Sequence, residues 1–146
     1  GFTMGFEMQG GAMQNIHVRN CDILMASGQG RTGGHSGFSI VCDGPATVQN
    51  ILFEDIRVED QIEYKNLEII CTEGRRYGTK GPGHIKGVFL KNIYWANPNK
   101  PFVIAGVPNS LVEDVTFENC FLNGKRLTGL KDADFQTEFV KDIKFK

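Results

Sequence analysis

The sequence has little cysteine, proline or tryptophan and almost no net charge. Of its 146 residues, four are cysteine, five are proline and one is tryptophan, and 16 Lys and Arg balance 17 Asp and Glu. No two cysteines have the Cys-x-x-Cys spacing, which disfavours a structural zinc site, and four cysteines are too few for a disulfide-built scaffold. The balanced charge disfavours nucleic-acid or anionic-membrane partners. No apolar run approaches the roughly 20 residues that a transmembrane helix needs.

Glycine and phenylalanine are abundant by contrast, with 18 and 11 residues. Glycine permits tight turns, and phenylalanine is a bulky residue that favours strands. Apolar residues recur with a period of two, and no segment shows the 3.6-residue stripe of an amphipathic helix. The length suits one domain over residues 1–146, so we expect a single all-β domain.

The chain repeats itself. Four segments align without a gap and a fifth partial copy ends the chain; they begin at Asn15, Asn50, Gly87, Asp114 and Asp142. Their first apolar residues stand 35, 37, 27 and 28 positions apart. A second set of short apolar segments alternates with the first, at residues 2–4, 38–40, 67–69 and 102–104. A period of about 30 residues with two or three strands is typical of one turn of a parallel β-solenoid, whereas hairpins repeat every 8 to 12 residues or so.

Equivalent residues of a solenoid stack about 4.8 Å apart, so like residues should lie over like. Two apolar columns are predicted to face the core, namely Ile16, Ile51, Val88, Val115, Ile143 and Val18, Phe53, Leu90, Phe117, Phe145. A polar column between the strands contains Asn20, Asp55, Asn92 and Asn119. Asn and Asp tolerate left-handed bends and can bond neighbouring backbone, which favours a stacked ladder over ordinary turn residues.

Two of the cysteines, Cys42 and Cys71, fall in register in adjacent units. In-register parallel strands hold side chains roughly parallel, rather than in the crossed geometry of a disulfide. We therefore favour stacked free thiols, and a disulfide between these two residues is the alternative.

Two further runs of motifs carry a family resemblance. The first is Gly5-Phe6-Glu7, Gly10-Gly11 and Asn15-Ile16, and the second is Asn123-Gly124-Lys125, Asp132-Ala133-Asp134-Phe135 and Val140-Lys141-Asp142-Ile143. In this order the chain resembles the C-terminal rungs of pectin-lyase-like β-helices, especially the polygalacturonase-like and dextranase-like glycoside hydrolases. The resemblance implies a right-handed, single-stranded parallel β-helix of about four rungs.

The catalytic motifs of polygalacturonases are missing. The resemblance places their Asn-Thr-Asp, Asp-Asp and Gly-His-Gly motifs before Phe2, and an Arg-Ile-Lys motif would fall on residues 39–41, which carry no positive charge. We expect the chain to be the C-terminal part of a secreted or periplasmic polysaccharide hydrolase whose main catalytic motifs lie elsewhere. The alternative is a non-catalytic carbohydrate-binding or structural β-solenoid, and whether the chain is an enzyme stays open.

The resemblance also places a substrate groove outside residues 38–42, flanked by two long loops. These loops carry Arg31, His35, Arg75, Arg76, Tyr77 and Lys80. Guanidinium groups and an aromatic ring suit the carboxylates and hydroxyls of a polysaccharide or oligosaccharide, and the alternative is solvated loops without function. We expect no cofactor and no metal, because no phosphate-binding glycine motif occurs and His17, His35 and His84 lack a repeated ligand spacing.

Two carboxylates are weak catalytic candidates. Glu7 follows Phe2 by five residues and Asp43 follows Phe38 by five, which places both in one column of adjacent units. A pair about 5 Å apart would suit retaining glycoside hydrolysis, with one group as acid and the other as nucleophile. The alternative is a pair of solvated turn carboxylates.

The two ends of the solenoid also carry expectations. An unpaired N-terminal rung favours edge-to-edge pairing, so we expect a homo-oligomer formed through this end. Residues 127–139 are expected to cap the other end.

Overall fold

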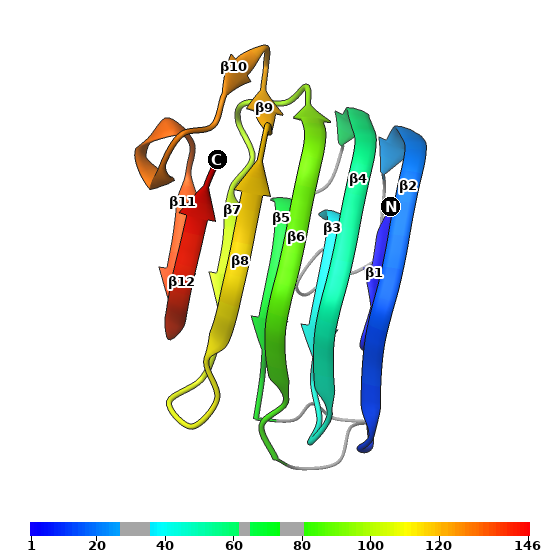
Figure 1. Cartoon of the computed structure of the whole chain (residues 1–146), viewed down its shortest axis with the longest axis vertical. Helices are drawn as coiled ribbons and strands as arrows, with labels where there is room; N and C mark the ends of the chain where they lie inside the picture. The colour runs from blue at the N-terminus through cyan, green and yellow to red at the C-terminus, as the bar shows by residue number, and fades with distance from the viewer. Residues whose placement is uncertain (27–35, 62–64, 74–80) are drawn as a thin grey trace.

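The computed structural model describes residues 1–26, 36–61, 65–73 and 81–146 (Figure 1). Their regular structure is β-strand, apart from one turn of 3-10 helix, η1 (Leu130–Asp132). The strands are β1 (Phe2–Met4), β2 (Ala12–Ala26), β3 (Ser36–Cys42), β4 (Thr47–Gln61), β5 (Lys65–Cys71), β6 (His84–Trp95), β7 (Phe102–Ala105), β8 (Val112–Glu118), β9 (Phe121–Leu122), β10 (Lys125–Arg126), β11 (Phe135–Glu138) and β12 (Val140–Phe145). In this part of the chain no helix is long and apolar enough to cross a membrane.

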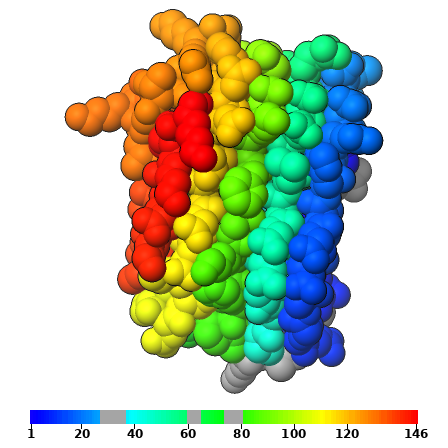
Figure 2. Space-filling model, viewed as in Figure 1, coloured from blue at the N-terminus to red at the C-terminus, as the bar shows by residue number. Residues whose placement is uncertain are grey.

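The strands form two sheets, and the strands from β1 to β8 alternate between them. The short sheet has the order β1-β3-β5-β7-β11, and all its pairs are parallel. The long sheet joins β2, β4, β6, β8 and β12 in parallel, with β9 also on β6 and β10 antiparallel to β9. The long sheet faces the viewer in Figures 1 and 2. The all-β prediction is confirmed, and interleaved parallel sheets are compatible with a β-helix.

The pairing register matches the sequence repeat. Ile51 pairs with Ile16 on one side and with Val88 on the other. In the short sheet, Phe38 pairs with Phe2 and with Leu67. Residues about 30 apart are therefore neighbours in space, as the alignment predicted.

The core lies between the two sheets. The central members of both predicted columns are fully buried: Ile51, Val88, Val115, Phe53, Leu90 and Phe117. Aromatic rings join the sheets, with 4.9 Å between the ring centroids of Phe38 and Phe53 and also between those of Trp95 and Phe102. Burial of each such side chain stabilises the fold by about 1.5–3 kcal/mol, so stacking across sheets supplies the main stabilisation.

The long strands β2, β4 and β6 bend twice, at residues whose φ is positive. The first column of bends is Asn15, Asn50, Gly87, Asp114 and Asp142, and the second is Asn20, Asp55, Asn92 and Asn119. Strand pairing skips these positions in β2, β4 and β6. Gly, Asn and Asp are the residues that adopt left-handed φ most readily.

The second column is the polar ladder that the sequence predicted. Asn92 Nδ2 donates to Asp55 Oδ1 at 2.7 Å, and Asn119 Nδ2 donates to Asn92 Oδ1 at 2.7 Å. The stacked-ladder interpretation is therefore confirmed for Asp55, Asn92 and Asn119. The first column is a second set of bends, which the sequence analysis treated only as the start of each repeat.

The cysteines Cys42 and Cys71 pair in register, and both are free and buried. Burial is the main cause that raises the pKa of each thiol, that of Cys71 to about 12. The stacked-thiol interpretation is confirmed.

The segment 127–139 does more than cap the C-terminal end. Leu127 is buried, and Asp132 Oδ2 accepts hydrogen bonds from the Thr128 and Gly129 amides at 2.6 and 2.9 Å. The rest of the segment forms β11, which pairs with β7 as the fifth strand of the short sheet. Residues 127–139, which were predicted only to cap this end, thus also add a strand to the short sheet.

Candidate functional site

An exposed aromatic plate lies on the outer face of the long sheet, near the C-terminal ends of its strands. Tyr94 pairs in register with Phe121, and their rings stack with centroids 5.1 Å apart and an interplanar angle of 7°. Tyr94 remains 43% exposed. The ring of Phe121 therefore stacks on one face of the Tyr94 ring, and the Tyr94 side chain is open to solvent elsewhere.

The bend at Asn92 explains why Tyr94 faces outward. In a regular strand, residues two apart share a face, so Leu90 and Tyr94 would both point into the core. Asn92 adopts a left-handed conformation and shifts the alternation by one residue. As a result Leu90 and Ile93 are buried, whereas Tyr94 is exposed.

A guanidinium group lies beside this plate. Arg57 pairs in register with Tyr94 on one side and with Asp22 on the other. Its Nε donates to Asp22 Oδ1 at 2.8 Å and its Nη2 to Asp22 Oδ2 at 2.7 Å. The Arg57 hydrogen bond is the main cause that lowers the pKa of Asp22. This bidentate pair uses two of the five N–H donors of arginine, so three remain for a ligand.

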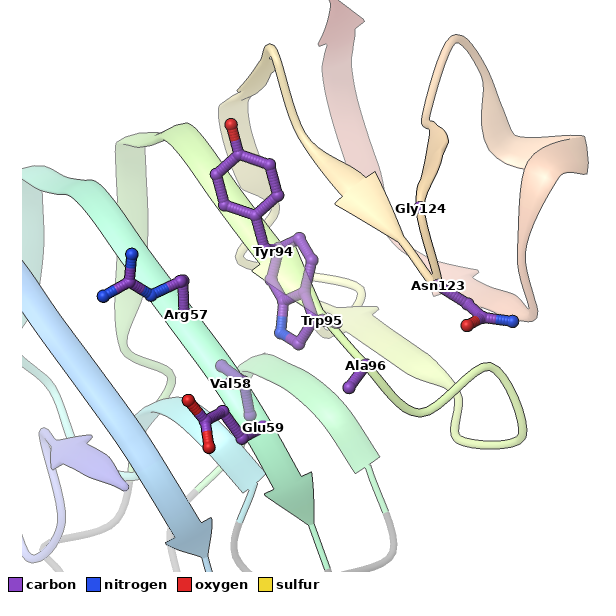
Figure 3. A pocket seen from close by; sticks show the side chains of 8 residues that line it. All are labelled: Arg57, Val58, Glu59, Tyr94, Trp95, Ala96, Asn123 and Gly124. Carbon is purple, nitrogen blue, oxygen red and sulfur yellow. The ribbon is translucent and has the colours of Figure 1, made fainter.

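The plate and the guanidinium border a hollow of about 310 Å³, the Tyr94 hollow (Figure 3). It is lined by Arg57, Val58, Glu59, Tyr94, Trp95, Ala96, Asn123 and Gly124. Asn123 and Gly124 form the turn between β9 and β10, both with positive φ, as expected for an Asn-Gly hairpin.

Trp95 is among the lining residues, but its indole ring lies in the core against Phe38 and Phe102. Its side chain is 1% exposed, and its Nε1–H has no hydrogen-bond acceptor among the described residues. A buried polar group without a partner is uncommon in native proteins, and each instance calls for an unseen partner or a functional explanation.

A second hollow of about 310 Å³ continues this surface across the ladder. It is lined by Asp55, Arg57, Asn92, Tyr94 and Asn119, and so shares Arg57 and Tyr94 with the Tyr94 hollow. Together the two hollows combine an aromatic plane with a guanidinium, carboxylates and amides. Such a surface suits a ligand that has both an apolar ring face and several hydroxyl groups.

The two carboxylate candidates occupy different environments. Asp43 is 1% exposed, and its Oδ1 accepts a hydrogen bond from the Met8 amide at 3.1 Å. Glu7 is exposed and has a φ of 58°. The pairing of β1 with β3 ends at Met4 and Ile40, three residues before Glu7 and Asp43 respectively. Catalysis by Glu7 and Asp43 stays a prediction.

The predicted groove beside β3 shows buried polar contacts where the structure describes it. Ser39 is fully buried on the face of β3 opposite Phe38, and its Oγ donates to Glu68 Oε2 at 3.1 Å. Lys65 forms an ion pair with the same carboxylate. The candidate loop residues Arg31, His35, Arg75, Arg76, Tyr77 and Lys80 lie outside the described residues. Their role in saccharide binding stays a prediction.

No group of three or more His, Cys, Asp or Glu side chains suited to a metal ion occurs among the described residues. No family model, no curated protein and no solved structure matches the chain. The candidate site is therefore argued from its geometry alone.

Sequence reasoning missed the Tyr94 hollow because it looked for charged loops. A signal was present, since Tyr94 and Phe121 occupy one column of the repeat and lie 27 residues apart. Stacked aromatic residues at an outward-facing position form a plate in any solenoid.

Proposed function

We propose that this chain is a right-handed parallel β-helix of about four rungs, part of a polysaccharide-active protein, and that these rungs bind saccharide without cleaving it. Alternation between two parallel sheets supports the coiled path, and crossover connections between parallel strands of one sheet are right-handed in about 98% of cases. The observation that carries the binding proposal is the exposed Tyr94–Phe121 stack beside Arg57.

Each part of the Tyr94 hollow has a role in this proposal. The ring of Tyr94 packs against the apolar face of a pyranose, with little loss of side-chain freedom because Phe121 already supports it. The free N–H groups of Arg57 donate to sugar hydroxyls, and Glu59 and Asn123 can accept hydrogen bonds from them.

Calorimetric titration with neutral glucan and xylan hexasaccharides tests the proposal. Tyr94→Ala should weaken binding about tenfold, which corresponds to about 1.4 kcal/mol, whereas Tyr94→Phe should retain most of the affinity. Leu130→Ala is the matched control, because Leu130 is equally exposed, at 43%, but lies in η1 outside the hollow. Absence of binding to every neutral saccharide, or equal binding by Tyr94→Ala, would overturn the proposal.

The second candidate function is glycoside hydrolysis by Glu7 and Asp43. The alignment of the two carboxylates in the repeat and the hydrogen bond from the Met8 amide, next to Glu7, to Asp43 Oδ1 at 3.1 Å support it. Release of reducing ends from the same oligosaccharides tests it. Turnover that disappears in both Glu7→Gln and Asp43→Asn, with unchanged circular dichroism, would replace the binding proposal with a hydrolase.

Self-association through the N-terminal edge is also part of the proposal. β1 and β2 end their sheets, and the core-facing Met13, Ile16 and Val18 of β2 are only partly buried. A long edge with apolar core positions favours pairing with a second copy. Light scattering at increasing concentration should show dimers or larger species, and a strict monomer would refute this part.

A secreted or periplasmic location is proposed from the ligand class alone, and cell fractionation tests it.

A further inference from the structure

A third hollow lies on the outer face of the long sheet, on the other side of the ladder from the Tyr94 hollow. This Phe89 hollow has a volume of about 390 Å³, and Phe89, Lys86, Lys144, Lys146, Asp114 and Gln49 line it. Phe89 is 43% exposed, although it stands in the middle of β6 between Leu52 and Thr116. An exposed phenylalanine ring surrounded by lysines is an apolar plate within a positively charged rim.

The described lining of this hollow has three lysines and one carboxylate, Asp114. Elsewhere on the face, two cations pair across strands: Lys91 with Glu54 at 2.9 Å and Arg57 with Asp22 at 2.7 Å. In the Phe89 hollow, Lys144 lies 3.5 Å from Asp114. Lys86 and Lys146 have no ion-pair partner among residues 1–26, 36–61, 65–73 and 81–146. The described charges thus leave an unbalanced positive group here, which attracts anions.

Lysine and arginine side chains favour different classes of anionic ligand. Arginine grips planar carboxylates through a bidentate fork, whereas lysine presents a compact charge with three rotatable donors. Among the described residues that line the hollow there are lysines and no arginine. Several lysine ammonium groups around one volume suit a tetrahedral sulfate ester, whose oxygens point in several directions.

The Phe89 and Tyr94 hollows lie along one strand. Phe89 and Tyr94 are five residues apart on β6, which is about 16 Å in an extended strand and less across the bend at Asn92. Lys91 lies between them on the outer face and is partly exposed. One saccharide chain of several sugar units can therefore contact both plates.

We propose that the outer face of β6 binds a sulfated saccharide chain, with a sulfate ester in the Phe89 hollow and a sugar ring on Tyr94. This inference rests on the proposed function, because it names the ligand class for the same face. Lys86 and Lys146 donate to the sulfate oxygens, and Phe89 packs against the ring that carries the ester.

Titration with a chondroitin 4-sulfate hexasaccharide and its chemically desulfated form tests the inference. The desulfated form keeps its carboxylates, so the comparison isolates the sulfate. The sulfated form should bind about tenfold more tightly, and Lys86→Gln with Lys146→Gln should reduce this advantage below about twofold. The matched control is Lys125→Gln with Lys131→Gln, which removes two exposed lysines outside the hollow and should leave the advantage unchanged.

The outcomes separate the two proposals. If neutral saccharides bind through Tyr94 but the sulfated form shows no lysine-dependent advantage, the sulfate inference is wrong and saccharide binding stands. If inorganic sulfate alone competes as well as the hexasaccharide does, the hollow is an anion site and the saccharide assignment fails. If no saccharide binds, the proposed function and the inference fail together.

Discussion

Replacement of Asn92 tests the ladder and the bend together. Asn92 has a φ of 53°, donates to Asp55 and accepts a hydrogen bond from Asn119, each at 2.7 Å. Asn92→Ala removes both hydrogen bonds, at about 1 kcal/mol each for partly exposed groups. Alanine also lacks the polar side chain with which asparagine can form local hydrogen bonds in the left-handed conformation. Holding alanine at this φ therefore costs about 1 kcal/mol more. We expect a loss of about 3 kcal/mol in the free energy of unfolding.

Asn92→Gly separates the two causes. Glycine loses the same hydrogen bonds but adopts a positive φ without strain, so the loss should be about 2 kcal/mol. Glycine already occupies the neighbouring bend column at Gly87, with a φ of 69°. The alanine variant should therefore be less stable than the glycine variant, which is the reverse of the usual order in strands.

Urea unfolding followed by circular dichroism measures both losses. Asn99 is the matched control, because it is exposed and is not among the residues with positive φ. At Asn99, alanine should be at least as stable as glycine. If the alanine variant is as stable as the glycine variant at Asn92, the left-handed bend does not limit stability and the reasoning is wrong.

Three further predictions concern the core, the surface ion pair and the thiols. Phe117→Ala should lower the free energy of unfolding by about 3–5 kcal/mol, measured by urea unfolding, because the ring is fully buried among three other rings. The folded-state pKa of Asp22 is lowered mainly by Arg57, so its stabilising effect is present above the ordinary value of 3.8 and is lost as pH falls through the lowered value. Arg57→Gln should remove this pH dependence in acid unfolding and raise the Asp22 pKa seen by NMR. In native protein at pH 8, a thiol reagent should leave Cys71 unmodified and modify the less buried Cys21 first, with all four cysteines reacting in denaturant.

The repeat made the register of both sheets predictable. Ile16, Ile51 and Val88 were aligned on apolar character alone, and they pair as aligned. In stacked parallel strands each residue lies between the equivalent residues of the repeats before and after it. The same residue type therefore suits every repeat. For this reason the two core columns and the ladder could be read from one sequence.

The fifth strand of the short sheet could not be predicted in this way. In β11 only Phe135 is partly buried, and the residues after it are exposed. Backbone hydrogen bonds to β7 hold this strand together with one ring, Phe135, which stacks on Phe102 with 4.8 Å between ring centroids. A strand with one apolar side chain has no alternating pattern in the sequence. The first bend column was missed for a related reason: Asn15 and Gly87 look like the ends of strands, whereas the chain bends and continues.

The candidate site could be read from the sequence only in part, because the shared column of Tyr94 and Phe121 does not give the face to which they point. Exposure of Tyr94 depends on the shift in alternation at Asn92, and a strict period of two would place it inward. The lysines of the Phe89 hollow come from β6 and from the end of the chain, near β12. Only the three-dimensional arrangement brings them to one hollow.

The unequal spacing of the repeats has a consequence for how such a chain can grow. The paired positions in the long sheet are 35, 37, 27 and 28 residues apart, yet every level keeps the same register. Differences in length are therefore absorbed in the connections, and the paired segments behave as interchangeable modules. Duplication of a whole module would lengthen the molecule without disturbing its neighbours, whereas deletion of a single residue within a paired segment would turn the remainder of that strand inside out.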